Sequence, residues 1–484
     1  QAMLAQALRR APPSVRSPQA SRPGRALCCH RPARMVATQG DEEGSAAKKQ
    51  RSDDGPTDDI LEDLDGTLLT REKFTARLAL EGNAPEVKSF EVVPGSEKRW
   101  AQSHSAKLRL TLQGEGTPTR TLFLKKVLGR HLPPKSLENL RRDLASNRNE
   151  ARFYQEFVPV LAARGVPFLR AVLVRDQLDV LDDRALSGAA DIEDAALRTG
   201  GMLLVLDSAE GYVQKSPFSK DEAADTLRMI AGFHAAAWED TQLLRNAAQR
   251  LHQVGGYWAL STRGEAQLKQ LHANWRQYLV NFSPLAPDLL ARDGVVRLAS
   301  RLEAMAHWVA EELTPKPGDP FATLVHGDLK AMNVFLPDAG SVESRVLPID
   351  FQWVGIGFGM ADVAMHVCHS VAADALREGG EECLVEGYLR SLAEQLGPKA
   401  SDYTAEIARR HYRLGVLDYA RFVIGQFFEG ASPEAFAARA ALPYAANIGL
   451  VYRNAEASFQ FVERIDDCLT HLERERAAAN ESPR

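Results

Sequence analysis

Three side chains, Asp328, Asn333 and Asp350, have the types and spacing needed to handle a proton and a metal ion. Asp328 and Asn333 form a D-x-x-x-x-N pattern. Apolar runs flank a turn-forming segment at residues 337–340, which predicts a hairpin that returns Asp350 to the side of Asn333. Transfer of a phosphoryl group needs such positioning and charge neutralisation rather than covalent chemistry by the protein.

These residues can be given roles in that reaction. Asp328 would accept the proton of the acceptor hydroxyl, while Asn333 and Asp350 would hold Mg²⁺ against the phosphates of ATP. Lys330, two residues after the base, would offer a positive charge to the transferred group. A surface loop rich in turn formers is the alternative for either segment alone, but two matched segments in the right order favour the phosphotransfer site.

The segments HGDLKAMN, IDFQ and GFGMADVAMHV resemble the aminoglycoside phosphotransferase and choline kinase-like superfamily, most closely its ecdysteroid kinase-like (CHK kinase-like) branch. The resemblance covers about residues 70–472. It implies a two-lobed, protein-kinase-like α+β fold with a small antiparallel-sheet N-lobe and a mainly helical C-lobe with inserted helices. It also implies that His326 and Asp362 are structural anchors of the catalytic loop.

Upstream residues fit the nucleotide side of such a site. The alternation of residues 87–128 predicts a small antiparallel sheet. The resemblance places Lys125, on the third strand, against the α- and β-phosphates. It pairs Lys125 with Glu150, in a helix that begins near Ser136. The alternative for Glu150 is a capping box at a restarting helix, because Asn147-x-x-Glu150 has that spacing.

The loop expected to cover the phosphates departs from the usual pattern. Residues 95–105 contain one glycine, so the backbone is less free to approach phosphates than in a glycine-rich loop. Ser103 and Ser105 are predicted to supply hydroxyl and amide donors instead. Leu206, at the end of a buried strand, and Ser208, in the connector that follows, are predicted to lie beside the adenine.

The spacing of the motifs indicates what kind of molecule would accept the phosphoryl group. More than eighty residues, with helical patterning, separate Trp238 from His326, and Asp362 follows Asp350 by only twelve residues. Inserted helices suit a walled site for a small alcohol, and the short second interval leaves no room for a long activation segment. We therefore predict a kinase acting on the hydroxyl of a small organic molecule. A protein serine/threonine kinase and a non-catalytic nucleotide-binding protein are the alternatives.

Two further motifs have structural interpretations. Aromatic residues of the C-terminal helices are typical of a core, although Trp353, Tyr419 and Phe422 with Asp418 would also suit a cage for a quaternary ammonium group. His234, on an apolar helix face, is interpreted as a packed core histidine.

The length and composition of the chain limit the classes of protein to which it can belong. With 484 residues, 45% of them hydrophobic, the chain can form one large or two fused lobes. No apolar run is long enough for a transmembrane helix. Five cysteines without paired spacing indicate a reducing compartment rather than a disulfide framework or a zinc site. The predicted divisions are an N-terminal segment at 1–59, an N-lobe at 60–206, a hinge at 207–215, a C-lobe at 216–473 and a polar tail at 474–484.

The N-terminal segment differs from the body in charge. Residues 1–40 contain seven arginines and no acidic residue, which is typical of a chloroplast or mitochondrial transit peptide. The alternative is an untargeted, disordered N-terminus on a cytoplasmic protein. Acidic residues outnumber basic ones in the rest of the chain, which disfavours nucleic acid as a partner. The sequence predicts no particular acceptor or oligomeric state.

Overall fold

The structure is a computed structural model that describes residues 60–80, 85–100, 102–134, 136–178, 198–341 and 345–481. All of them belong to one compact unit, Glu43–Arg484. The predicted transit peptide and linker at 1–59 lie outside the described residues.

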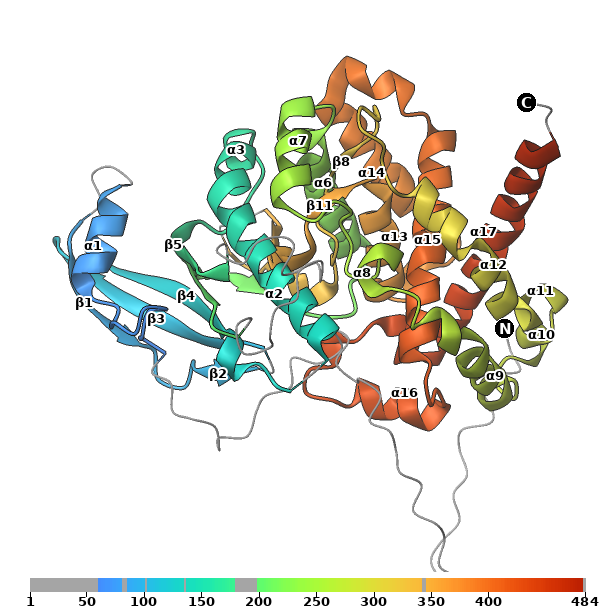
Figure 1. Ribbon diagram of the computed structural model, residues 1–484, viewed down its shortest axis with the longest axis horizontal. Helices are drawn as coiled ribbons and strands as arrows, with labels where there is room; N and C mark the ends of the chain where they lie inside the picture. The colour runs from blue at the N-terminus through green and yellow to red at the C-terminus, as the bar shows by residue number, and fades with distance from the viewer. Residues whose placement is uncertain are drawn as a thin grey trace, which may run out of the picture. The chain divides into compact units, whose positions relative to one another are not determined.

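A six-stranded antiparallel sheet forms where the alternating pattern predicted one (Figure 1). Its order is β1-β3-β4-β6-β5, and the short β2 pairs with β3. The strands are β1 Val87–Val92, β2 Lys98–Arg99, β3 His104–Leu112, β4 Thr119–Leu128, β5 Ala171–Asp176 and β6 Gly201–Asp207.

The two faces of this sheet bury different cores. Side chains alternate along a strand, so Leu203 of β6 packs in a small core with α1 (Arg71–Ala79), while Leu204 and Leu206 join the large core. Lys125 follows Leu124, which belongs to the small core, and therefore points to the opposite face. The sheet thus directs Lys125 toward the rest of the molecule.

Helix α2 (Leu137–Arg152) contacts β5, β6 and the turn at Phe351–Trp353, and Figure 1 shows it beside the sheet. The Ser136 side chain caps its N-terminus by accepting a hydrogen bond from the backbone of Asn139 (3.3 Å). The helix runs without a break past Glu150, so the alternative of a helix restarting at Asn147 is wrong. A π-helical turn, Phe153–Phe157, and α3 (Val158–Ala163) follow.

The remainder is mainly helical, and a capping box at Ser219 and Glu222 starts its first long helix. The helices are α6 Lys220–Ala237, α7 Thr241–Arg250, α8 Leu260–Arg263, α9 Leu271–Phe282, α10 Pro287–Leu290, α11 Asp293–Val296, α12 Leu298–Glu312, α13 Met360–Ser370, α14 Gly380–Leu396, α15 Ala405–Phe427, α16 Pro433–Ala440 and α17 Ala455–Glu481. Helix α17 continues into the residues predicted to form a polar tail.

Five short strands complete the fold. They are β7 Tyr212–Val213, β8 Thr323–Val325, β9 Val334–Pro337, β10 Leu347–Pro348 and β11 Gly355–Gly357. β10, β9 and β7 form one sheet, and β11 pairs with β8. The protein therefore has the α+β fold predicted, with an antiparallel sheet, a mainly helical part and helices α7–α12 inserted before β8.

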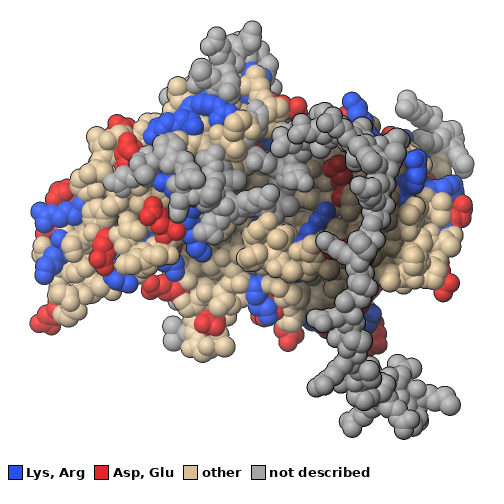
Figure 2. Space-filling view, turned by 90° about the horizontal axis from the view of Figure 1, so that it is seen from below, with Lys and Arg blue, Asp and Glu red and all other residues tan. Residues whose placement is uncertain are grey.

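None of the described helices is both long and apolar enough to cross a membrane. On the face shown in Figure 2, the described Lys and Arg residues are interspersed with Asp and Glu.

Candidate active site

Buried Asp362, in the first turn of α13, holds the loop that follows β8. Its carboxylate accepts hydrogen bonds from the backbone of His326 (2.6 Å) and Gly327 (2.9 Å), and His234 Nε2 lies 3.2 Å away. Burial disfavours the charge of Asp362, but the hydrogen bonds outweigh it and the pKa of Asp362 is lowered. The core histidine His234 therefore supports the predicted anchor rather than binding a ligand.

Gly327 allows the loop to pass close to other backbone segments. Its φ is +77°, and a Cβ there would lie 2.2 Å from the Trp353 carbonyl oxygen and 2.7 Å from the Gly256 nitrogen. The Gly327 carbonyl accepts a hydrogen bond from the backbone of Tyr257 (2.8 Å). Only glycine fits both the conformation and the space.

Asp328, Lys330 and Asn333 form one buried cluster on this loop. Lys330 Nζ lies 2.7 Å from Asp328 Oδ2, and Asn333 Nδ2 donates to Asp328 Oδ2 (3.1 Å) and to its carbonyl (2.8 Å). Burial raises the pKa of Asp328, and Lys330 offsets only part of this effect. Burial disfavours the charge of Lys330, but Asp328 and Asp350 outweigh it and the pKa of Lys330 is raised.

The predicted hairpin returns Asp350 to the same place. β10 pairs with β9, and the Ile349 backbone donates to the Asn333 carbonyl (2.9 Å). His326 Nε2 lies 3.0 Å from the Ile349 carbonyl, which ties the hairpin to the loop. Asp350 has a left-handed backbone conformation (φ 67°, ψ 60°), which is uncommon outside glycine and often found at functional sites.

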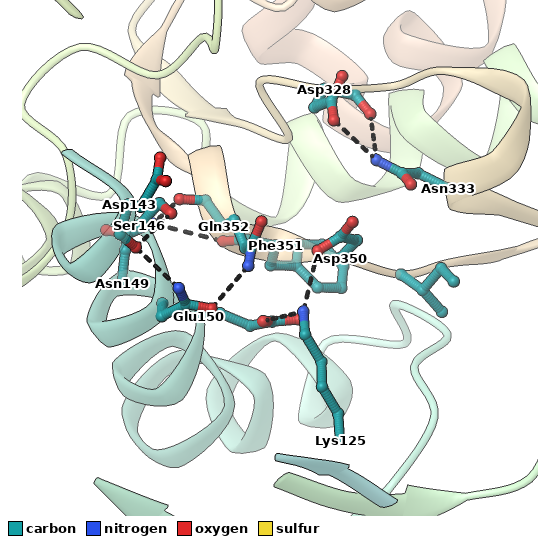
Figure 3. Close-up of polar contacts among 12 residues, drawn as sticks. Lys125, Asp143, Ser146, Asn149, Glu150, Asp328, Asn333, Asp350, Phe351 and Gln352 are labelled. Atoms are coloured by element: carbon teal, nitrogen blue, oxygen red, sulfur yellow. Dashed lines mark hydrogen bonds and ion pairs between the residues drawn. The ribbon is translucent and has the colours of Figure 1, made fainter. Parts of the chain in front are cut away.

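Lys125 reaches this hairpin from the sheet. Its Nζ lies 2.7 Å from Glu150 Oε2 and 3.3 Å from Asp350 Oδ1, as Figure 3 shows. Burial disfavours the charge of Lys125, but Asp350 and Glu150 outweigh it and the pKa of Lys125 is raised. The expected ion pair is present, and it joins β4, α2 and the hairpin.

Asn333 and Asp350 can supply oxygen ligands to a metal ion. Both amide hydrogens of Asn333 face Asp328, which leaves its Oδ1 as an acceptor, and Asp350 provides a carboxylate. Among the described residues no group of three or more His, Cys, Asp or Glu could hold a metal. A metal ion here would therefore depend on further oxygens from phosphates or water, which suits Mg²⁺.

A cavity of about 610 Å³ connects these groups. Lys125, Glu150, Asn333 and Asp350 line it, and so do the predicted adenine-side residues Leu206 and Ser208. Its other walls include Phe123, Leu204, Tyr212 and Phe335. A mostly apolar chamber with a polar end has the character of a small-ligand site.

The segment predicted to cover the phosphates differs from expectation. Residues 98–99 form β2 and Ser105 lies within β3, so the loop at 95–105 is shorter than predicted. The Ser105 hydroxyl accepts a hydrogen bond from Trp100 Nε1 (3.1 Å). Ser103 and Ser105 both line the cavity, but only Ser103 lies in the loop. The strand pairing explains the difference, because two residues suffice to extend the sheet.

Asn149 supports the site and was not identified from the sequence. Its Nδ2 lies 3.3, 3.2 and 2.9 Å from the carbonyl oxygens of Phe351, Gln352 and Val354, and its Oδ1 accepts from the backbone of His252 (2.9 Å). It therefore fixes the turn that follows Asp350. Its position four residues before the buried Phe153 was the available signal for an inward-facing polar group.

The alternative of an aromatic cage for a quaternary ammonium group is not supported. Asp418 forms an ion pair with Arg421 (2.8 Å), so its charge is already compensated. The Phe422 ring faces the guanidinium of Arg263, whose carbon lies 5.4 Å from the ring centroid. A cation of the protein itself occupies the face that the ligand would need.

Comparisons with known proteins agree with this organisation. The family model described as "Ecdysteroid kinase-like family" matches residues 103–398, a span that includes Lys125, Asp328 and Asp362. No curated protein matches the chain in sequence.

Solved structures show more distant similarity. The choline kinase of Streptococcus pneumoniae is 12% identical, with 82% of this chain and 97% of that chain covered and a TM-score of 0.36. An aminoglycoside phosphotransferase of Alicyclobacillus acidocaldarius is 15% identical, with 80% and 93% covered and a TM-score of 0.37. An ethanolamine kinase of Plasmodium vivax is 11% identical, with 79% and 80% covered and a TM-score of 0.33. The family match spans more than half of the chain, and the protein belongs to the ecdysteroid kinase-like family.

Proposed function

We propose that this protein transfers the γ-phosphoryl group of ATP, with Mg²⁺, to the hydroxyl of a small organic molecule. The observation that carries the proposal is the convergence of Asn333, Asp350 and the Lys125–Glu150 pair on one cavity, with Asp328 hydrogen-bonded to Asn333. These side chains come from β4, α2, the loop after β8 and the β9–β10 hairpin. Phosphoryl transfer needs this combination of a base, metal ligands and a phosphate-binding lysine.

Residues of this chain account for each step of the proposed phosphoryl transfer. The acceptor oxygen forms a bond to the γ-phosphorus while the bond from that phosphorus to the ADP oxygen breaks, and Asp328 takes the hydroxyl proton. Burial raises the pKa of Asp328, which makes it a stronger base than an exposed aspartate. Lys330, 2.7 Å from Asp328, holds the carboxylate in place and adds positive charge beside the transferred group.

Asn333 and Asp350 fit Mg²⁺ because they offer hard oxygen donors beside Lys125, the residue we assign to the phosphates. Mg²⁺ bound there would neutralise phosphate charge. Lys125 would release Asp350 to the metal while keeping its closer contact with Glu150.

A small acceptor is favoured over a protein. Helices α7–α12 precede β8 and occupy the interval in which the sequence predicted inserted helices that would wall the acceptor site. After Asp350 the chain passes through one 3₁₀ turn and β11 directly into α13, which carries Asp362. A long segment that could be ordered by phosphorylation is absent from this interval, all of which is described.

The test is a screen of metabolite extracts with ATP labelled at the γ-phosphate, in which the labelled product is isolated and identified. We expect label on a small alcohol with wild-type protein and none with Asp328→Asn. Label on casein with none on any small molecule would favour a protein kinase. Binding of Mg·ATP with no transfer to any acceptor would favour a non-catalytic protein.

A further inference from the structure

Arg263, the last residue of α8, is a buried cation. Only 8% of the residue is exposed, and its Nε and Nη1 atoms are buried with no hydrogen-bond partner among the described residues. Its guanidinium carbon lies 4.9 Å from the Tyr257 ring centroid and 5.4 Å from that of Phe422. Contacts with aromatic rings recover only part of the free energy lost when a charge leaves water.

Two other arginines of the helical part with little exposed surface, Arg421 and Arg464, are paired. Arg421 bonds to Asp418 (2.8 Å) and Gln267 (3.3 Å) and also donates to a backbone carbonyl. Arg464 has a bidentate ion pair with Glu381. Arg263 differs from these two arginines because its Nε and Nη1 have no hydrogen-bond partner among the described residues.

Arg263 lies close to the catalytic loop. The ring beneath its guanidinium belongs to Tyr257, whose backbone nitrogen donates to the carbonyl of Gly327, the residue before Asp328 (2.8 Å). A single residue, Tyr257, therefore contacts both Arg263 and the loop that carries the proposed base.

A second arginine approaches the same place from α2. The Nε of Arg142 is also buried without a hydrogen bond, and its nearest ion-pair contact is a 4.0 Å approach to Asp143 on the same helix. Burial lowers the pKa of Arg142, and the positive charge of Arg263 lowers it further, while Asp143 and Glu138 act in the opposite direction. The charges of these two guanidinium groups, on different helices, therefore disfavour each other.

We propose that Arg263, assisted by Arg142, binds an anionic group of the acceptor, so that the substrate is a hydroxylated acid. Guanidinium groups bind carboxylates, phosphates and sulfates through paired hydrogen bonds, and such a group would supply the missing acceptors. A cationic amine would be repelled from the same position. The inference rests on the proposed kinase function and adds the charge of its substrate.

The test uses one carbon skeleton in several charge states. The alcohols are 3-hydroxypropionate, 3-hydroxypropyl phosphate, 3-hydroxypropanamide and 3-aminopropanol, with a second set based on 4-(hydroxymethyl)benzoate, its amide and its amine. Transfer of labelled phosphate and equilibrium binding are measured separately with the full chain. We expect kcat/KM for an acid to exceed that for its amide by about 100-fold, as a charge-assisted pair implies. The carboxylate and phosphate members show which anion is preferred.

Arg263→Gln should remove this preference by raising KM for the acid at least tenfold and the KM for the amide much less. Arg263→Lys should keep part of the preference for the acid over the amide. Arg297→Gln, at an exposed ion pair with Asp293, is the control. Because the charge is uncompensated, Arg263→Gln should melt at the same temperature as wild type or higher, whereas a structural arginine would lower it.

The outcomes separate this inference from the proposed function. Transfer to neutral or cationic alcohols with no preference for acids, or an equal loss of acid and amide turnover in Arg263→Gln, would overturn the anion site. The same holds if neither binding nor transfer distinguishes the charge states. Binding of an acid that depends on Arg263, without label transfer to any acceptor, would support the anion site and count against the kinase.

Discussion

The two sides of the catalytic loop differ in how their charges are compensated. On the nucleotide side, Lys125 lies within 3.3 Å of both Glu150 and Asp350, so its buried charge is paired by the protein itself. On the other side, Arg263 is equally buried and its guanidinium faces two aromatic rings, with Nε and Nη1 unbonded to any described residue. A paired cluster can be stable before ligand binds, whereas an unpaired charge gains most when a ligand arrives.

This difference gives the two sides different roles: the nucleotide side is preorganised by its own ion pairs, and in our proposal the other side recognises the acceptor. The groups that we propose for phosphate binding hold their geometry through mutual ion pairs, which suits a cosubstrate shared by many enzymes. The acceptor groups determine which molecule is used, and a charge without an internal partner discriminates strongly between acceptors of opposite sign. The predictions below test each side and the loop between them.

The largest effect is expected at Asp328, which belongs to the loop between the two sides. Asp328→Asn should lower kcat by about 10³-fold or more, because the acceptor hydroxyl loses its base. Affinity for Mg·ATP should change little, since Lys125, Asn333 and Asp350 remain. Single-turnover kinetics and nucleotide titration measure the two properties. Asp338→Asn, on an exposed turn, is the control, and equal activity in wild type and Asp328→Asn would exclude the assigned base.

Glu150→Gln tests whether the nucleotide side depends on its internal ion pairs. The substitution leaves Lys125 with Asp350 alone, which the metal also needs, so kcat/KM for ATP should fall about 100-fold. Steady-state kinetics at varied ATP and Mg²⁺ measure the loss. Glu156→Gln removes a partly exposed ion pair with Arg250 nearby and should change the rate less than twofold. Similar effects of the two variants would show that pairing of Lys125 is not required.

Gly327→Ala tests how the loop is held against both sides. A Cβ at φ +77° would meet the Trp353 carbonyl at 2.2 Å, so we expect about 3 kcal/mol less stability and a reduced kcat. Gly318 has a similar φ of +84° with no atom near the position of its Cβ, and Gly318→Ala should cost only about 1 kcal/mol. Urea unfolding measures both. Equal losses would assign the effect to backbone conformation alone.

The smallest effect is a pH dependence of stability that we expect from His366, which contacts the backbone of the loop. Its Nδ1 lies 3.0 Å from the Leu329 carbonyl, and burial lowers the pKa of His366 to about 4. The unfolded chain binds a proton near pH 6.5 and the folded chain does not, so stability should fall as pH decreases from 6.5 toward 4. Between pH 7 and pH 5 the loss is about 2 kcal/mol for this histidine.

His366→Asn keeps a donor near the Nδ1 position and cannot titrate, so it should flatten this pH dependence. Urea unfolding at several pH values measures the change. His252, whose pKa burial also lowers to about 4, should contribute a similar loss in both proteins. An unchanged slope in the variant would contradict a neutral buried His366.

Local patterns were sufficient for the elements and for much of the site. The alternation of residues 87–128 predicted β1, β3 and β4, and the Ser136 cap predicted the start of α2. The motif around Asp328 and Asn333 predicted a hairpin returning Asp350, because a turn between two short apolar runs leaves the chain few other paths. The pairing of residues 98–99 with β3 was missed, since a two-residue strand has no periodicity.

The sequence alone determined the chemical groups and their order: a lysine on a strand, a glutamate on a helix, and two aspartates and an asparagine around a hairpin. The tertiary structure decided which charges are paired. Asp418 and Arg421 lie three residues apart and compensate each other, whereas the guanidinium of Arg263 faces the rings of Tyr257 and Phe422 and has two nitrogens unbonded to any described residue. Whether a buried charge has a partner depends on distances between segments far apart in the chain, and only packing sets those distances.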